Sequence, residues 1–253
     1  MDGPLQLRRP NPRPPPELQN FIVDATVRVG FYSNIAPSLV EFALAHHVQV
    51  LVLNLITSPL PDTAFDFTFS SYINNRSLKQ ISLGCANINP PLGCQGFASL
   101  KSLRLWRCKL TDEITRETLL KCELLESLII DKCRELKHVK IFGPRLKHVT
   151  FVRRPQRYTL VEVNNAPYLI ALKCGSGKFI CLGHLPCLAE ANLFLDSSDN
   201  VIGIDVVKAL LDEKLSHVEP LGVDYWFLRV NYEIEMEMTK LFPAKDGGFV
   251  YHF

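Results

Sequence analysis

Apolar residues recur along this chain in one register, with polar residues between them. The two clearest copies, Leu100–Cys108 and Leu125–Cys133, share the pattern L-x-x-L-x-L-x-x-C, with isoleucine at the third apolar position of the second copy. Within each copy, apolar and polar positions alternate over five residues, which is the period of a half-buried β-strand. The pattern therefore predicts one short strand per repeat, with its leucines buried and the residues between them on an exposed face.

The same register can be followed over most of the sequence. Copies begin at Val48, Leu78, Leu100, Leu125, Leu146, Leu169, Leu188 and Leu215. From Leu78 to Leu188 the successive starts are 22, 25, 21, 23 and 19 residues apart, close to the roughly 20–29 residues of a leucine-rich repeat. We therefore predict an α/β leucine-rich-repeat solenoid with a parallel β-sheet on its concave side. Its strands are expected at 50–54, 80–84, 102–106, 127–131, 148–152 and 170–174.

The segments that connect the strands differ along the chain. Thr111–Lys121 has a threonine and an aspartate at its start and acidic residues in its first turn, which predicts a short helix. The later connections, Leu136–Ile141, Tyr158–Val163 and Lys178–Leu182, show partial alternation and predict strands. A proline precedes the next repeat by two residues at Pro144, Pro167 and Pro186, where a residue without a donor N–H fits a corner. We expect short helices in the early coils and β-rich returns in the later ones.

The ends of the chain fit the repeat less well. Residues 1–20 are rich in proline and arginine and are expected to form a disordered tail, with a proline-recognition ligand as the alternative. Residues 21–47 are expected to hold a strand near 25–33 and a capping helix near 38–47, before a solenoid at 48–232. The segment 233–253 is divergent from the repeats.

Composition narrows the possible partners. The chain has 28 Lys and Arg against 26 Asp and Glu, a formal charge of +2, so no global field predicts binding to nucleic acid or to a membrane. No apolar run approaches the roughly 18–20 residues of a membrane helix, and the N-terminus lacks a signal-peptide core. We therefore expect the chain in the cytoplasm or nucleus, with its eight cysteines reduced and mostly buried.

No motif predicts catalysis, a cofactor or a metal. Gly175–Lys178 resembles part of a phosphate-binding loop but lacks the first glycine and the final Ser or Thr of that motif. His46 and His47 are adjacent, so they point about a hundred degrees apart on a helix, and we interpret them as a solvated helix end. We expect a protein that is not an enzyme.

Several segments resemble one protein family. Leu39–Asn54, Asn75–Leu83, Leu124–Cys133 and Pro144–Phe151 are similar in order and spacing to the leucine-rich region of plant F-box/LRR proteins of the RNI-like, FBD type. The resemblance covers about residues 26–223. It implies a receptor that holds the target of an SCF-type ubiquitin ligase. The F-box that binds the ligase adaptor lies upstream in that family and is not found in this sequence, so we expect target binding without adaptor binding.

The exposed strand positions give the candidate site. The expected function is a non-catalytic protein-interaction scaffold, with a hormone or inositol-phosphate co-receptor as the alternative. The exposed positions between the core leucines are Arg104, Trp106, Ile129, Asp131, Thr150, Val152 and Lys173. Two residues after the last core position of three successive strands come Arg107, Lys132 and Arg153. This ladder of positive charges predicts a protein partner with an acidic or phosphorylated segment, with a solvated face as the alternative.

Overall fold

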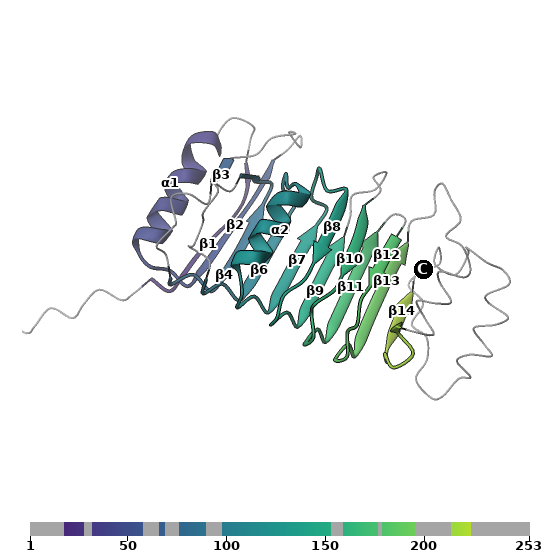
Figure 1. Cartoon of the computed structure of the whole chain (residues 1–253). Coiled ribbons are helices and arrows are strands. Elements are labelled where there is room, and N and C mark those ends of the chain that lie inside the picture. The colour runs from purple at the N-terminus through teal and green to yellow at the C-terminus, as the bar shows by residue number, and fades with distance from the viewer. Residues whose placement is uncertain are drawn as a thin grey trace, which may run out of the picture.

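The computed structural model describes residues 18–27, 32–57, 66–68, 76–89, 98–152, 159–176, 179–195 and 214–223. These residues form a solenoid, and Figure 1 shows its strands stacked side by side from the purple to the yellow end. Nine strands form one sheet in which every neighbouring pair is parallel. In spatial order they are β1 (Asn20–Val27), β2 (Val50–Thr57), β4 (Gln80–Gly84), β6 (Ser102–Trp106), β7 (Ser127–Asp131), β9 (His148–Val152), β11 (Ala171–Ser176), β13 (Glu190–Leu195) and β14 (Leu221–Val223).

The predicted solenoid is confirmed. Each of the six expected strands lies in the long sheet within one residue of its expected start. The core positions stack in register, because Leu103 pairs with Leu128 and Leu128 with Val149. All three side chains are at most 2% exposed. The apolar residues of successive repeats therefore form one continuous core.

The N-terminal elements differ from the expected ones. The first strand, β1, spans Asn20–Val27 and pairs with β2, so it belongs to the long sheet and lies earlier than the expected 25–33. Its alternation was obscured because the exposed position 22 carries an isoleucine, 63% exposed. The helix α1 (Tyr32–Ala45) begins six residues before the expected start and contains Pro37. Buried Ala36 on the same helix face as Val40 extends the packed stripe across the proline.

The return segments follow the prediction. The helix α2 (Asp112–Lys121) lies in the coil between β6 and β7, and Figure 1 shows it over the sheet. The later returns, β8 (His138–Ile141), β10 (Leu160–Val163) and β12 (Phe179–Leu182), form a parallel sheet of three strands. A third sheet pairs β3 (Asp66–Thr68) with β5 (Asn87–Asn89). Strands on both sides of the solenoid in its later half are thus confirmed.

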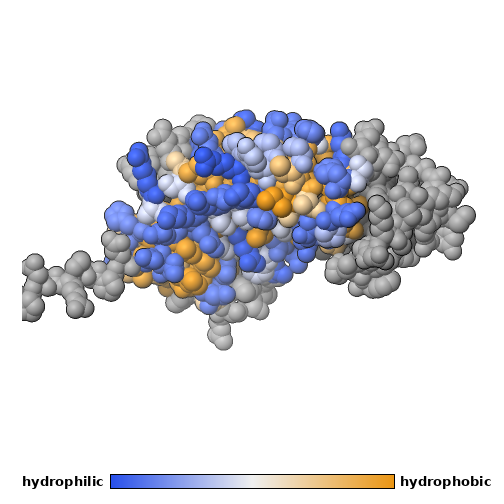
Figure 2. Space-filling view, turned by 90° about the horizontal axis from the view of Figure 1, so that it is seen from below, coloured by the Kyte–Doolittle hydropathy of each residue, from blue (hydrophilic) through white to orange (hydrophobic). Residues whose placement is uncertain are grey.

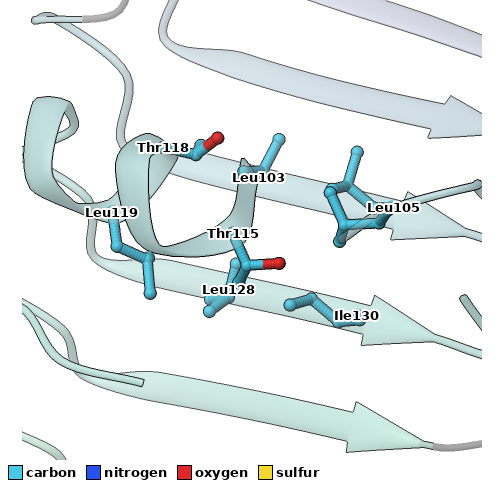
Figure 3. Close-up of a pocket in the computed structure, with 8 residues that line it drawn as sticks. Leu103, Leu105, Thr115, Thr118, Leu119, Leu128 and Ile130 are labelled. Carbon is cyan, nitrogen blue, oxygen red and sulfur yellow. The ribbon is translucent and has the colours of Figure 1, made fainter. Parts of the chain in front are cut away.

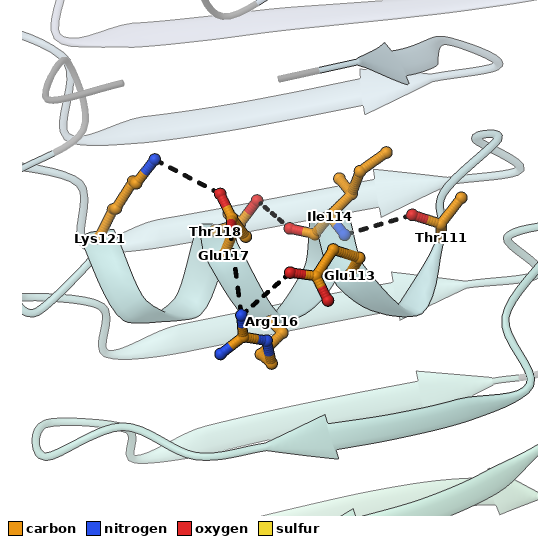
Figure 4. A network of polar contacts seen from close by, with 7 residues as sticks. All are labelled: Thr111, Glu113, Ile114, Arg116, Glu117, Thr118 and Lys121. Carbon is orange, nitrogen blue, oxygen red and sulfur yellow. Dashed lines mark hydrogen bonds and ion pairs between the residues drawn. The ribbon is translucent and has the colours of Figure 1, made fainter. Parts of the chain in front are cut away.

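The sequence explains where α2 begins and ends. The Thr111 side chain accepts a hydrogen bond from the Ile114 N–H at 3.3 Å, which satisfies one of the free donors of the first turn. Figure 4 shows the polar contacts along its outer side, where Arg116 lies 3.0 Å from Glu113 and Lys121 lies one turn from Glu117. The basic residue near the C-terminus and the acidic residues near the N-terminus complement the helix dipole.

Each strand of the central repeats ends in a sharp backbone turn. Arg107 and Lys132 both have φ of 52°, and Cys85 at the equivalent position has φ of 57°. The residue that directly follows Arg107 or Lys132 is a buried cysteine. The Cys108 thiol lies 3.4 Å from the Leu83 carbonyl oxygen of the preceding coil. The Cys133 thiol lies 3.5 Å from a carbonyl oxygen of its own preceding coil. Buried cysteines therefore occupy the position that often holds asparagine in this repeat.

Candidate functional site

The long sheet has one packed face and one open face. On β6, Leu103 and Leu105 are buried, whereas Arg104 is exposed and Trp106 is half-buried. This alternation repeats on β7 and β9. We call the surface formed by the residues that alternate with the core positions the open face; it corresponds to the concave side expected from the sequence.

The structure brings the predicted site residues together in two rows. Strand register places Arg104, Ile129, Thr150 and Lys173 side by side in the first row, and Trp106, Asp131 and Val152 in the second. Arg104 and Lys173 are exposed, and the other five are half-buried. The predicted residues of four successive strands therefore share one surface.

Two aromatic rings on the open face contact cations. The guanidinium carbon of Arg107 lies 4.8 Å from the centroid of the Trp106 ring, and the Lys173 ammonium lies 5.4 Å from that of Phe194. A Cβ added to Gly84 would lie 3.1 Å from the Trp106 ring, so the glycine on β4 leaves room for the indole. Sequence analysis missed Phe194, although it alternates with the core residue Leu193 after the repeat that starts at Leu188.

The open face and the turns that directly follow its strands carry cations that have no ion pair within the described part of the chain. Arg104, Arg107, Lys132 and Lys173 make no salt bridge to any described carboxylate. Arg107 and Lys132 occupy equivalent turns, as the predicted ladder requires. Arg153, the third member of that ladder, lies outside the described residues.

Elsewhere, many cations are neutralised locally. Glu126 accepts from Lys147 at 2.8 Å and pairs with Lys101 at 3.3 Å, and these two lysines lower its pKa. On the three-stranded sheet, Glu162 lies 3.3 Å from Lys140. The described surface seen in Figure 2 is largely hydrophilic, with hydrophobic residues in separate patches. On the open face, by contrast, none of the four cations is neutralised by a described carboxylate.

Asp131 contributes a buried acceptor to the same face. Its Oδ1 atom is buried and has no hydrogen-bond partner among the described residues. Its backbone carbonyl accepts from the Arg107 N–H at 2.8 Å. A buried acceptor without a donor costs about 1–3 kcal/mol, so a donor brought by a ligand would be favourable at this position.

A small cavity lies between α2 and the sheet. It holds about 10 Å³, roughly room for one water molecule, and is lined by Leu103, Leu105, Leu110, Thr115, Thr118, Leu119, Leu128 and Ile130. Figure 3 shows these side chains of α2 and of β6 and β7 turned toward one another. The co-receptor alternative requires basic residues that converge in a pocket, and the lining of this cavity contains none.

Two further properties concern the described residues alone. No group of three or more His, Cys, Asp or Glu side chains among them could hold a metal ion. Neither of their helices is long and apolar enough to span a membrane. His46 lies at the end of α1, where its Nδ1 is 2.8 Å from the Phe42 carbonyl oxygen, as expected for a helix end.

Comparisons with known proteins agree with this geometry. A family model described as "At1g61320/AtMIF1, LRR domain" matches residues 29–225. The chain is 32% identical over 209 residues to F-box/LRR-repeat protein At3g03360 of Arabidopsis thaliana, covering 76% of this chain and 41% of that protein. It is 34% identical over 104 residues to F-box/LRR-repeat protein 25 of the same plant, covering 41% of this chain and 38% of that protein. The chain thus spans less than half the length of these curated relatives, and no solved structure matches.

Proposed function

The chain belongs to the At1g61320/AtMIF1 leucine-rich-repeat family, and from this premise we propose that its open face binds a protein partner. The proposed role is that of a non-catalytic scaffold. The observation that supports it most is Trp106, a half-buried aromatic residue whose ring contacts Arg107 and whose strand also carries Arg104. Neither cation makes a salt bridge to a described carboxylate. Tryptophan and arginine are enriched among the residues that dominate protein–protein binding energy.

The finer part of the proposal concerns the biological setting. Relatives of this chain are named F-box/LRR-repeat proteins, so we infer that the solenoid holds the target of an SCF-type ubiquitin ligase. Its site of action would be the plant cytoplasm or nucleus. All seven cysteines in the described part of the chain are free, which agrees with a reducing compartment.

A binding experiment with two truncated side chains tests the proposal. The chain is immobilised, exposed to plant cell extract, and the retained proteins are identified by mass spectrometry. We expect Trp106→Ala to lose partners that the unmodified chain retains, because it removes the central aromatic contact of the open face. Leu120→Ala is the matched control, since Leu120 is an apolar residue on the helix α2 and is 50% exposed.

Two readouts make the outcome clear. Both variants should unfold at the same temperature as the unmodified chain, because neither side chain belongs to the buried core. Partners that bind equally to the unmodified chain and to Trp106→Ala would contradict a binding site on the open face.

A further inference from the structure

We propose that the partner segment held on the open face is an acidic peptide, laid across β6, β7, β9 and β11. This inference rests on the proposed protein-binding function and names the chemistry that the face would recognise.

The spacing of the cations suits an extended chain. Arg104 on β6 and Lys173 on β11 occupy the same row, three strands apart. Adjacent strands lie about 4.8 Å apart, so the two cations are separated by roughly 14 Å, which four or five extended residues span. Apart from the half-buried Asp131 on β7, the acidic residues of this face lie toward the two ends of the sheet, with Asp24 on β1 and Glu190 on β13. The positive zone is therefore confined to the central strands.

Two of the turns after the strands hold a charged residue in an unfavourable backbone conformation. Arg107 and Lys132 have φ of 52°, a left-handed backbone conformation that is less favourable for a residue with a side chain than for glycine. Glycine or asparagine would suit the turn better, and the equivalent Cys85 shows that the turn itself needs no charge. The two cations are thus explained by recognition better than by folding.

The guanidinium of Arg107 is positioned so that its N–H groups can bind a carboxylate. Its contact with the Trp106 ring places the guanidinium beside the open face without using its N–H donors in an ion pair. Those donors form bidentate hydrogen bonds with carboxylates. The partly exposed ring beside them can accept an apolar side chain of the same segment.

The acceptor on Asp131 selects a peptide over other polyanions. The Oδ1 atom, buried and unpartnered among the described residues, requires a hydrogen-bond donor. The backbone of a peptide supplies N–H donors beside its acidic side chains, whereas the phosphates of a nucleic acid present acceptors. The Asp131 carboxylate, which lies among cations, therefore suits a ligand that has both N–H donors and acidic groups, such as a peptide.

Selection from a random-peptide library displayed on phage tests the inference with the full chain. We expect the enriched peptides to be rich in Asp and Glu, to bind at least about tenfold more tightly than their Gln and Asn counterparts, and to weaken as salt rises. Replacement of one Glu by phosphoserine then shows whether carboxylate or phosphate is preferred, and tighter binding would assign the segment to a phosphorylated partner.

Four variants connect the binding to the proposed residues. Arg104→Gln and Lys173→Gln remove charge from the first row, while Arg107→Asn and Lys132→Asn remove it with a residue that tolerates the turn. Each variant should lower the affinity for acidic peptides by about three- to tenfold without lowering the melting temperature of the chain. Lys137→Gln, at an exposed residue that immediately precedes β8, should change nothing and serves as the control.

The outcomes separate this inference from the proposed function. Enrichment of neutral or basic peptides, absence of any enriched peptide, or indifference to all four variants would overturn the acidic segment. Single-stranded DNA that binds the unmodified chain as tightly as the acidic peptides do, and is weakened by the same four variants, would also overturn it. If peptide binding depends on Trp106 but not on the charged residues, the proposed protein-binding function stands and the acidic segment is wrong. If the binding of both retained proteins and peptides is also unaffected by Trp106→Ala, both proposals are wrong.

Discussion

At the scale of single residues, burial determines the behaviour of the core thiols. Desolvation raises the pKa of Cys122 and of Cys174 to about 12. It also raises the pKa of Cys133 well above 9.0, and the adjacent Cys108 adds to that shift. A folded pKa above the unfolded one means that the thiol stabilises the fold fully below about pH 9. That contribution is lost as pH rises from there toward about 12.

Removal of one buried thiol should therefore reduce the loss of stability at alkaline pH. Between about pH 8 and about pH 10.5, the free energy of unfolding should decrease in both proteins. We expect the decrease to be roughly 2 kcal/mol smaller in Cys174→Ala than in the unmodified chain. Urea unfolding at the two pH values measures this difference. An equal pH dependence in Cys174→Ala would contradict the burial of that thiol.

Sequence reasoning located most of the open face but missed its local geometry. Alternation with the leucines placed Arg104 and Trp106 correctly, since a strand period fixes which side a residue faces. The left-handed backbone of Lys132 could not be predicted, because lysine has no preference for that conformation. Nor could the contact between Arg107 and Trp106, which depends on side-chain orientation across the turn.

At the scale of elements, capping signals decided what could be predicted. The start of α2 was predicted correctly because the Thr111 side chain accepts from a free N–H group and the acidic residues after it complement the helix dipole. The carboxylate of Asp112 also accepts from the N–H groups of Lys137 and His138 at 2.9 and 3.0 Å, which connects the helix to β8. The true start of α1 was not predicted, because Pro37 lies inside the helix and no Ser, Thr, Asp or Asn directly precedes Tyr32.

The cap of α2 should contribute measurably to stability. Thr111→Ala removes the acceptor for the Ile114 N–H and should lower the free energy of unfolding by about 1 kcal/mol. Thr111→Ser keeps the hydroxyl and should change it little. Chemical denaturation of both variants measures the effect. Equal loss in the two variants would show that the threonine methyl group, and not the cap, stabilises this turn.

At the scale of the whole molecule, stability depends on contacts between neighbouring coils. Each strand of the long sheet pairs only with the strands beside it, so a defect in one coil weakens both adjacent interfaces. The repeat spacing predicted this stacking well, since a fixed register of apolar residues requires a continuous core. It did not reveal that β1 adds a further strand at the N-terminal end.

Truncation in the central coil tests this coupling. Leu128 is 1% exposed, and Leu128→Ala should lower the free energy of unfolding by roughly 2–5 kcal/mol. Hydrogen exchange should accelerate in β6 and β9 as well as in β7. Leu120→Ala, on the exposed side of α2, should cost far less. Faster exchange confined to β7 would contradict a stack in which neighbouring coils support one another.

The central claim is that the open face is the surface on which this chain binds its protein partner. Lysine acetylation followed by mass spectrometry tests it directly, with and without a partner or peptide selected by the unmodified chain. Lys132 and Lys173 lie on the open face and its turn, whereas the exposed Lys137 and Lys140 lie at β8 on the opposite side. The account predicts that bound partner slows acetylation of Lys132 and Lys173 and leaves Lys137 and Lys140 unchanged. Protection of Lys137 and Lys140 with unaltered Lys132 and Lys173 would contradict it.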